Sequence, residues 1–236
     1  LLLINAELAV RAAQAGKCSE AKRQVRLMQE SGFETRVVSE ALHRVTEPLR
    51  ERLKTTCQSA NRDISLDASR GATIVRRLLE HSLPLLAAID CLLPAGDPMR
   101  DGAHDEVALE ALRGQIAFGN KTDDWATCVA HLEQVLPIAA SASACARIKE
   151  NLGIVNENKS YSTCFFCEKR PTNADSEIEV DVHGNVETFD IPGGTRTTWN
   201  HSTVTVPRCP ECYSIHHKWS NIRTTGWLVT AVSLAT

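Results

Sequence analysis

The sequence lacks the features of several common protein classes. It contains no phosphate-binding loop and no G-x-G-x-x-G, H-E-x-x-H or G-x-S-x-G motif, so no motif in it predicts a nucleotide-binding, metalloprotease or hydrolase site. Its formal net charge of -3 excludes a polycationic nucleic-acid binder. A hydrophobic fraction of 43% in 236 residues is nevertheless enough for one or two folded domains.

The two ends of the chain are apolar. No basic region precedes the apolar start LLLINAELAV, so we expect no signal peptide. Residues 226–236 are apolar, but this run is about half as long as a membrane-spanning helix. We expect a soluble piece of a longer protein, in which the run is either the beginning of a membrane helix or a terminal element packed on the fold.

Composition changes near residue 160. Only three of the eleven aromatic residues precede it, and residues 1–159 are rich in Ala, Leu, Glu, Arg and Gln, which favour helices. Residues 160–208 are rich in Thr, Val and aromatic residues separated by turn residues, as strands are. We therefore predict an α+β chain with a helical module at 1–159, a small antiparallel β module at 160–223 and an apolar tail at 224–236.

Apolar spacing and breaker residues predict the helices of the first module. Gly16 and Gly32 end the first two helices, and Ser19 caps the second. Pro48 either kinks a later helix or starts a new segment, and Pro84 breaks another helix. Further helices are expected from residue 34 onward and at 69–93, 105–118, 122–140 and 142–156, with a turn at 119–120.

Two stretches of this module share a helix–turn–helix pattern. Residues 12–28 and 117–139 each end one apolar helix, turn at a glycine and begin a second helix. This pattern resembles tetratricopeptide (TPR) repeats, although the 34-residue period is not sustained. An irregular antiparallel helical bundle is the alternative interpretation.

The most specific motif is a pair of cysteine knuckles. Cys164 and Cys167 form one C-x2-C, Cys209 and Cys212 form another, and 41 residues separate them. Two-residue spacing lets a tight turn direct both sulfurs at one ion, and two such turns supply the four ligands of a closed tetrahedral zinc site. We predict one structural Zn²⁺, because four thiolates leave no position for water. A module of about sixty residues needs this support, since its own core is small.

The segment between the knuckles predicts a small antiparallel meander that resembles a zinc ribbon. Ile178, Val180 and Val182 alternate with polar residues, so one strand face is apolar. Gly184–Asn185 and residues 192–194 are the expected turns. We expect three aromatic side chains to fill the thin core, namely Phe166, Trp199 and Tyr213.

Other chemistry for the same cysteines has to be weighed. Two disulfides would require an oxidising compartment, and five further cysteines on predicted helices argue against one and for a cytoplasmic protein. A thioredoxin-like pair needs a βαβ context that is absent, whereas iron in a four-thiolate or cluster site stays open. We interpret the five remaining cysteines as small buried side chains, namely Cys18, Cys57, Cys91, Cys128 and Cys145.

Three histidines lie near these motifs. His216 follows the second knuckle and could reach the metal, but four thiolates complete the coordination, so we expect it beside the site or on the surface. His183 and His201 lie between the knuckles, and we find ligand spacing for neither.

The stretches CFFCEKRPTN and VPRCPECYSIH, set behind a helical module, resemble a group of bacterial proteins of unassigned function. In that group, degenerate TPR-like helices, sometimes attached to a J-domain, precede a C-x2-C/C-x2-C module and one or two membrane helices. The resemblance covers residues 121–156, the two knuckles and the apolar C-terminus, which is under half of the chain. Glu168 departs from it, because a glycine is expected after the first knuckle. The resemblance implies metal binding and a membrane-proximal position, and it implies no reaction.

These observations favour a non-enzymatic adaptor. We predict that the helices bind a protein partner and that the zinc module forms a rigid cap at the cytoplasmic face of a membrane. A nucleic-acid-binding ribbon is disfavoured, because residues 160–223 carry eight acidic against six basic side chains. A thiol or metal redox protein would need an open coordination position or an activated cysteine beside a base, and the sequence predicts neither.

Overall fold

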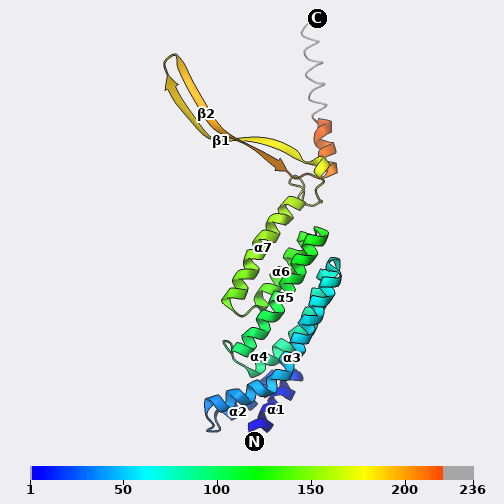
Figure 1. The fold of residues 1–236 in the computed structure, drawn as a ribbon, viewed down its shortest axis with the longest axis vertical. Helices are drawn as coiled ribbons and strands as arrows, with labels where there is room; N and C mark the ends of the chain where they lie inside the picture. Colours follow the sequence, from blue (N-terminus) through cyan, green and yellow to red (C-terminus); the bar gives the residue numbers. More distant parts are fainter. Residues whose placement is uncertain (1, 220–236) are drawn as a thin grey trace. The chain divides into compact units, whose positions relative to one another are not determined.

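The computed structural model describes residues 2–219, and its contacts divide the chain into two compact units between Asn156 and Glu157. The predicted α+β class is confirmed, since helices form the first unit and an antiparallel sheet lies in the second (Figure 1). The TPR-like and zinc-ribbon-like descriptions of these units stay predictions. Among residues 2–219, no helix is long and apolar enough to cross a membrane, and the predicted apolar tail at 224–236 lies outside the described residues.

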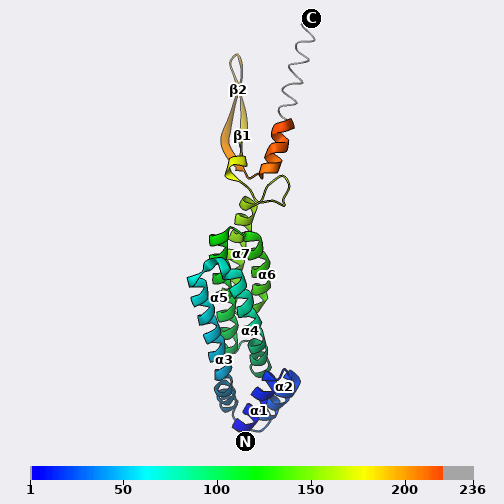
Figure 2. The ribbon, with the colours of Figure 1, turned by 90° about the vertical axis from the view of Figure 1, so that its right-hand side faces the viewer.

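Long helices packed side by side form the first unit (Figures 1 and 2). The longest three, α3, α4 and α5, contact one another, and the α1–α2 hairpin packs on α3 and α4. In chain order the elements are α1 (Leu2–Gln14), α2 (Cys18–Gln29), α3 (Thr35–Leu66), η1 (Ala68–Arg70), α4 (Gly71–Leu92), α5 (Pro98–Thr122), α6 (Trp125–Val135), η2 (Leu136–Ile138) and α7 (Ala142–Ser162).

The glycine signals at the first two helix ends are confirmed. Gly16 and Gly32 follow α1 and α2 with φ of 73° and 82°, a left-handed conformation that glycine adopts without steric cost. The predicted cap is wrong, because α2 begins at Cys18 and Ser19 is already helical. The residue before the helix is Lys17, which makes no side-chain capping bond.

Both helical prolines lie inside continuous helices, so the predicted break at Pro84 is wrong. α3 passes through Pro48 over 32 residues, and α4 passes through Pro84. Buried apolar residues follow each proline, among them Leu49 and Leu86. Burial of such side chains is worth about 1.5–3 kcal/mol each, which offsets the hydrogen bond that each proline removes.

The predicted turn at Gly119–Asn120 is also wrong, because α5 continues to Thr122. Asp97 caps this helix by accepting hydrogen bonds from the backbone N–H groups of Met99 and Arg100. Gly119 is buried, and a Cβ at this position would overlap the ring of Trp125. The glycine therefore serves the close packing of α6 on α5, and the chain turns instead at Asp123, whose φ is 57°.

The second unit contains one long antiparallel hairpin, β1 (Ile178–Ile191) and β2 (Gly194–Val206), in place of the predicted meander. Pro192 and Gly193 form its turn, where proline presets φ and Gly193 supplies a φ of 97°. The predicted turn at Gly184–Asn185 is wrong, because both residues lie in β1. The register shifts there, between Gly184 and Glu187, and the strands continue to pair beyond it.

The hairpin has no covered face in the described part of the chain. Val180 and Val182 are 42% and 46% exposed on one face, and Trp199 is 53% exposed. Phe166 and Tyr213, the other expected core aromatics, are exposed as well. The prediction of an aromatic core is therefore wrong, because a two-stranded ribbon has no second layer to pack against.

Candidate metal centre

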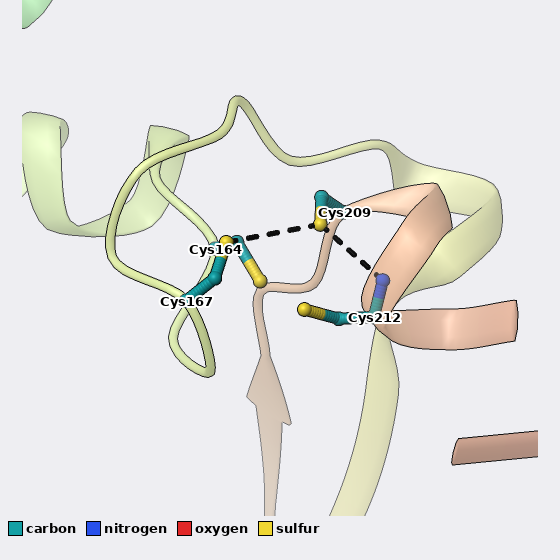
Figure 3. A group of neighbouring side chains, drawn as sticks. All are labelled: Cys164, Cys167, Cys209 and Cys212. Atoms are coloured by element: carbon teal, nitrogen blue, oxygen red, sulfur yellow. Dashed lines mark hydrogen bonds between the residues drawn. The ribbon is translucent and has the colours of Figure 1, made fainter. Parts of the chain in front are cut away.

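The structure brings the four knuckle cysteines together (Figure 3). Cys164 and Cys167 lie in the turn that follows α7. Cys209 directly precedes the helical residues 210–219, and Cys212 lies in their first turn. Their Sγ atoms all lie within 4.8 Å of one another, and three of the four residues are buried. We call Cys164, Cys167, Cys209 and Cys212 the four-cysteine cluster.

The distance between one pair of these sulfurs fits a tetrahedral ion. At a Zn–S distance of about 2.3 Å, two sulfurs on a tetrahedron lie about 3.8 Å apart. The Sγ atoms of Cys167 and Cys209 are 3.9 Å apart. The donor set is also the one that a closed structural zinc site uses, and four-thiolate iron has the same ligands.

Backbone hydrogen bonds around the knuckles hold them in place. The N–H of Cys164 donates to the Arg170 carbonyl at 2.9 Å, and the N–H of Glu168 donates to the Cys164 carbonyl at 2.8 Å, which closes the first turn. The N–H of Phe165 donates to the Pro207 carbonyl at 2.9 Å and joins the two knuckles. The hairpin makes this junction possible, because pairing of Ile178 with Val206 returns the chain to its starting point.

The thiols of the four-cysteine cluster differ in how readily they lose a proton. Burial raises the pKa of the Cys164 thiol, but backbone N–H groups of Cys209, Cys167 and Phe166 lie against its sulfur and bring it down to about 6. Burial and the neighbouring sulfurs raise the pKa of Cys212 to about 12. A thiolate on one cysteine therefore disfavours ionisation of its neighbour. A divalent cation bound by the four sulfurs would offset this electrostatic repulsion.

Two arginines that sequence reasoning missed support the second knuckle. Arg208 is 6% exposed, donates from Nε to the Ser176 carbonyl at 2.7 Å and lies over the Tyr213 ring at 4.8 Å. Arg170 lies near the Cys209 sulfur and Glu211, which raise the pKa of its guanidinium. An arginine directly before the second knuckle, and another three residues after the first, are the sequence signals that mark them.

The structure places His216 beside the cluster. Its Nδ1 lies 3.4 Å from an Arg208 nitrogen, and its ring packs edge-on against Phe166 with centroids 4.4 Å apart. His216 therefore contacts two residues that flank the cysteines.

Two cysteines that were interpreted as unpaired form a disulfide. Cys18 of α2 and Cys91 of α4 are bonded, so that interpretation is wrong for this pair. The argument against an oxidising compartment loses this pair as support. Cys57 and Cys128 are buried and unpaired as expected, and Cys145 is partly exposed. The two cysteines are 73 residues apart and meet only because α2 packs against α4. The sequence around each cysteine gives no information on that packing.

Comparison of the chain with protein-family models, with curated proteins and with solved structures gave no match.

Glu168 occupies the position where a glycine is expected after the first knuckle, and its φ is 53°. A side chain in this left-handed region costs about 1–2 kcal/mol, and glycine loses about 0.5–1 kcal/mol more backbone entropy on folding. We expect Glu168→Gly to slow the loss of metal to a chelator, and Glu168→Val to accelerate it. Chelator-challenge half-lives of the full chain measure this effect. Lys169→Gly is the matched control, whose φ is not positive, and it should lose metal no more slowly than the wild type.

Proposed function

We propose that this chain is a non-enzymatic adaptor whose second unit is held together by one structural zinc ion. The observation that carries the proposal is the four-cysteine cluster, in which four sulfurs lie within 4.8 Å of one another and those of Cys167 and Cys209 are 3.9 Å apart. Four thiolates complete the coordination of zinc, so the ion has no position for water or substrate. The expected role of the ion is therefore folding rather than catalysis.

The proposal is tested on the full chain purified without added metal. We expect one zinc per chain by native mass spectrometry. We also expect the four cluster cysteines to resist alkylation until a chelator is added, whereas partly exposed Cys145 reacts without a chelator. Bound iron would redirect the proposal to electron transfer. A metal-free chain with Cys164 joined to Cys167 would overturn it.

We further propose that the helical unit supplies the adaptor's binding surface. A cleft of about 420 Å³ lies between α3 and α5, a volume typical of binding pockets. Its charged residues are Glu106, Glu110 and Arg113, so its net charge is negative. Glu110 is 7% exposed in its side chain and burial raises its pKa, although Arg113 lies 3.0 Å away. A partner that inserts a lysine or arginine side chain complements this cleft.

Photo-crosslinking from Gln58, which lines the cleft, tests this surface in cells. We expect a partner that is captured by the wild type and lost from Glu106→Lys, because the substitution reverses a cleft charge. Glu133→Lys, an exposed charge reversal on α6, should leave capture intact. Equal capture by both variants would exclude the cleft.

The resemblance also leads us to propose a membrane-proximal position. Membrane fractionation of chains with and without residues 226–236 tests this proposal.

A further inference from the structure

The polar face of the hairpin gathers three metal-binding side chains that have no role in the four-cysteine cluster. His183 of β1 and His201 of β2 are directly opposite each other in the ladder. Asp181 precedes His183 by two residues, so the alternation of strand side chains puts it on the same face. Directly opposed residues have Cβ atoms about 4.5–5.5 Å apart, close enough for two imidazoles to share one ion.

Two of these side chains already lie at the distance expected for two ligands of one metal ion. Nε2 of His201 lies 3.1 Å from Oδ1 of Asp181. An ion at about 2.0–2.1 Å from nitrogen and about 2.0–2.2 Å from oxygen sets those two atoms about 3.0–3.4 Å apart. The rings of His183 and His201 have centroids 5.3 Å apart. His183 is exposed, so its ring is free to turn toward the other two ligands.

Neighbouring groups orient the ligands and favour a cation. The Thr203 hydroxyl donates to Oδ1 of Asp181 at 2.9 Å, the kind of contact that positions a ligating carboxylate. Glu179 lies on the same face, two residues before Asp181, and adds negative charge. Residues 179–183 and 199–205 include no lysine or arginine to compete for these carboxylates.

We propose that Asp181, His183 and His201 form a surface site for a divalent transition-metal ion. Two imidazoles and one carboxylate suit zinc, copper, nickel or iron, and leave positions open for water. Calcium and magnesium, which prefer oxygen ligands, do not suit this set. The ion would bridge β1 and β2 between the Ile178–Val206 end of the hairpin and the register shift at Gly184. It would thereby fix the register of a two-stranded ribbon that has no covered face.

Ni²⁺ is the probe, titrated calorimetrically into the full chain with the four-cysteine cluster filled with zinc. We expect one saturable Ni²⁺ per chain, at least tenfold weaker in His183→Ala and in His201→Ala. Asp181→Asn should also weaken it, because the amide oxygen is a poorer ligand than the carboxylate. His81→Ala is the matched control, an exposed histidine on α4, and should bind Ni²⁺ as the wild type does.

A local optical readout separates this site from other nickel binding. The Trp199 ring lies edge-on to His183 with centroids 5.8 Å apart, so bound Ni²⁺ should quench Trp199 fluorescence. Trp199→Phe should lose the quenching and keep the calorimetric binding. The zinc content of every variant should stay at one per chain, which shows that the cluster is intact. Absence of saturable binding in the wild type, or binding in both histidine variants that is as tight as in the wild type, would overturn the proposal.

Discussion

Replacing one ligand of the four-cysteine cluster should unfold the second unit. In residues 157–219, the buried apolar side chains are those of Cys164, Cys209 and Cys212. Structural zinc contributes about 10–16 kcal/mol to the folding of such sites, and the exposed hairpin has no other core to replace it. For Cys209→Ser we expect loss of the zinc and loss of hydrogen-exchange protection along β1 and β2.

The same measurement should leave the first unit unchanged. Helices α1 to α6 have their own core and contain none of the four cysteines, so far-UV circular dichroism should stay strongly helical. Cys145→Ser is the control, because Cys145 is partly exposed and outside the cluster. A Cys209→Ser chain that keeps both its zinc and the protection of the hairpin would contradict the assignment of the ligands.

The second large effect concerns the Cys18–Cys91 disulfide of the helical unit. The bond closes a loop across 73 residues, which corresponds to about 4 kcal/mol of lost conformational entropy in the unfolded chain. We expect Cys18→Ala/Cys91→Ala to lower the free energy of unfolding of the first unit by about this amount. Urea denaturation monitored by helical circular dichroism measures the change.

Reductant distinguishes this effect from simple cavity formation. The wild type should lose stability when the disulfide is reduced, whereas the double variant should have the same urea midpoint with and without reductant. Cys57→Ala provides the contrast, because it removes a buried thiol that forms no disulfide. If the wild-type midpoint does not respond to reductant, the bond contributes nothing to stability in solution.

Short-range patterns predicted the parts of the molecule that depend on local geometry. The C-x2-C spacing identified the four cysteines that converge, and Gly16 and Gly32 marked two helix ends. The break predicted at Pro84 was wrong, because buried residues on the C-terminal side of this proline stabilise α4 by packing in a core formed with other helices. A single proline in the sequence indicates that a helical hydrogen bond is lost at that position. It does not show whether burial of neighbouring side chains offsets the free energy of that loss.

The pair His183 and His201 shows how one local error spreads. Assigning the turn to Gly184–Asn185 places His183 at the end of a short strand, far in register from His201. Of the two predicted turns, the one at residues 192–194 is confirmed, at Pro192 and Gly193. Without a turn at Gly184–Asn185 the strands are longer, and they set the two histidines opposite each other. Register follows from the position of the turn, so a turn placed wrongly changes every cross-strand neighbour.

The length of the hairpin gives the four-cysteine cluster a mechanical role. A strand of 14 residues at about 3.3 Å each extends for about 45 Å, and its base adjoins the second knuckle at Pro207. The cluster thus lies at the base of a long, narrow hairpin. A force applied to the turn at Pro192 and Gly193 would act on the cluster over this length, and loss of the proposed ion would let the hairpin move about its base.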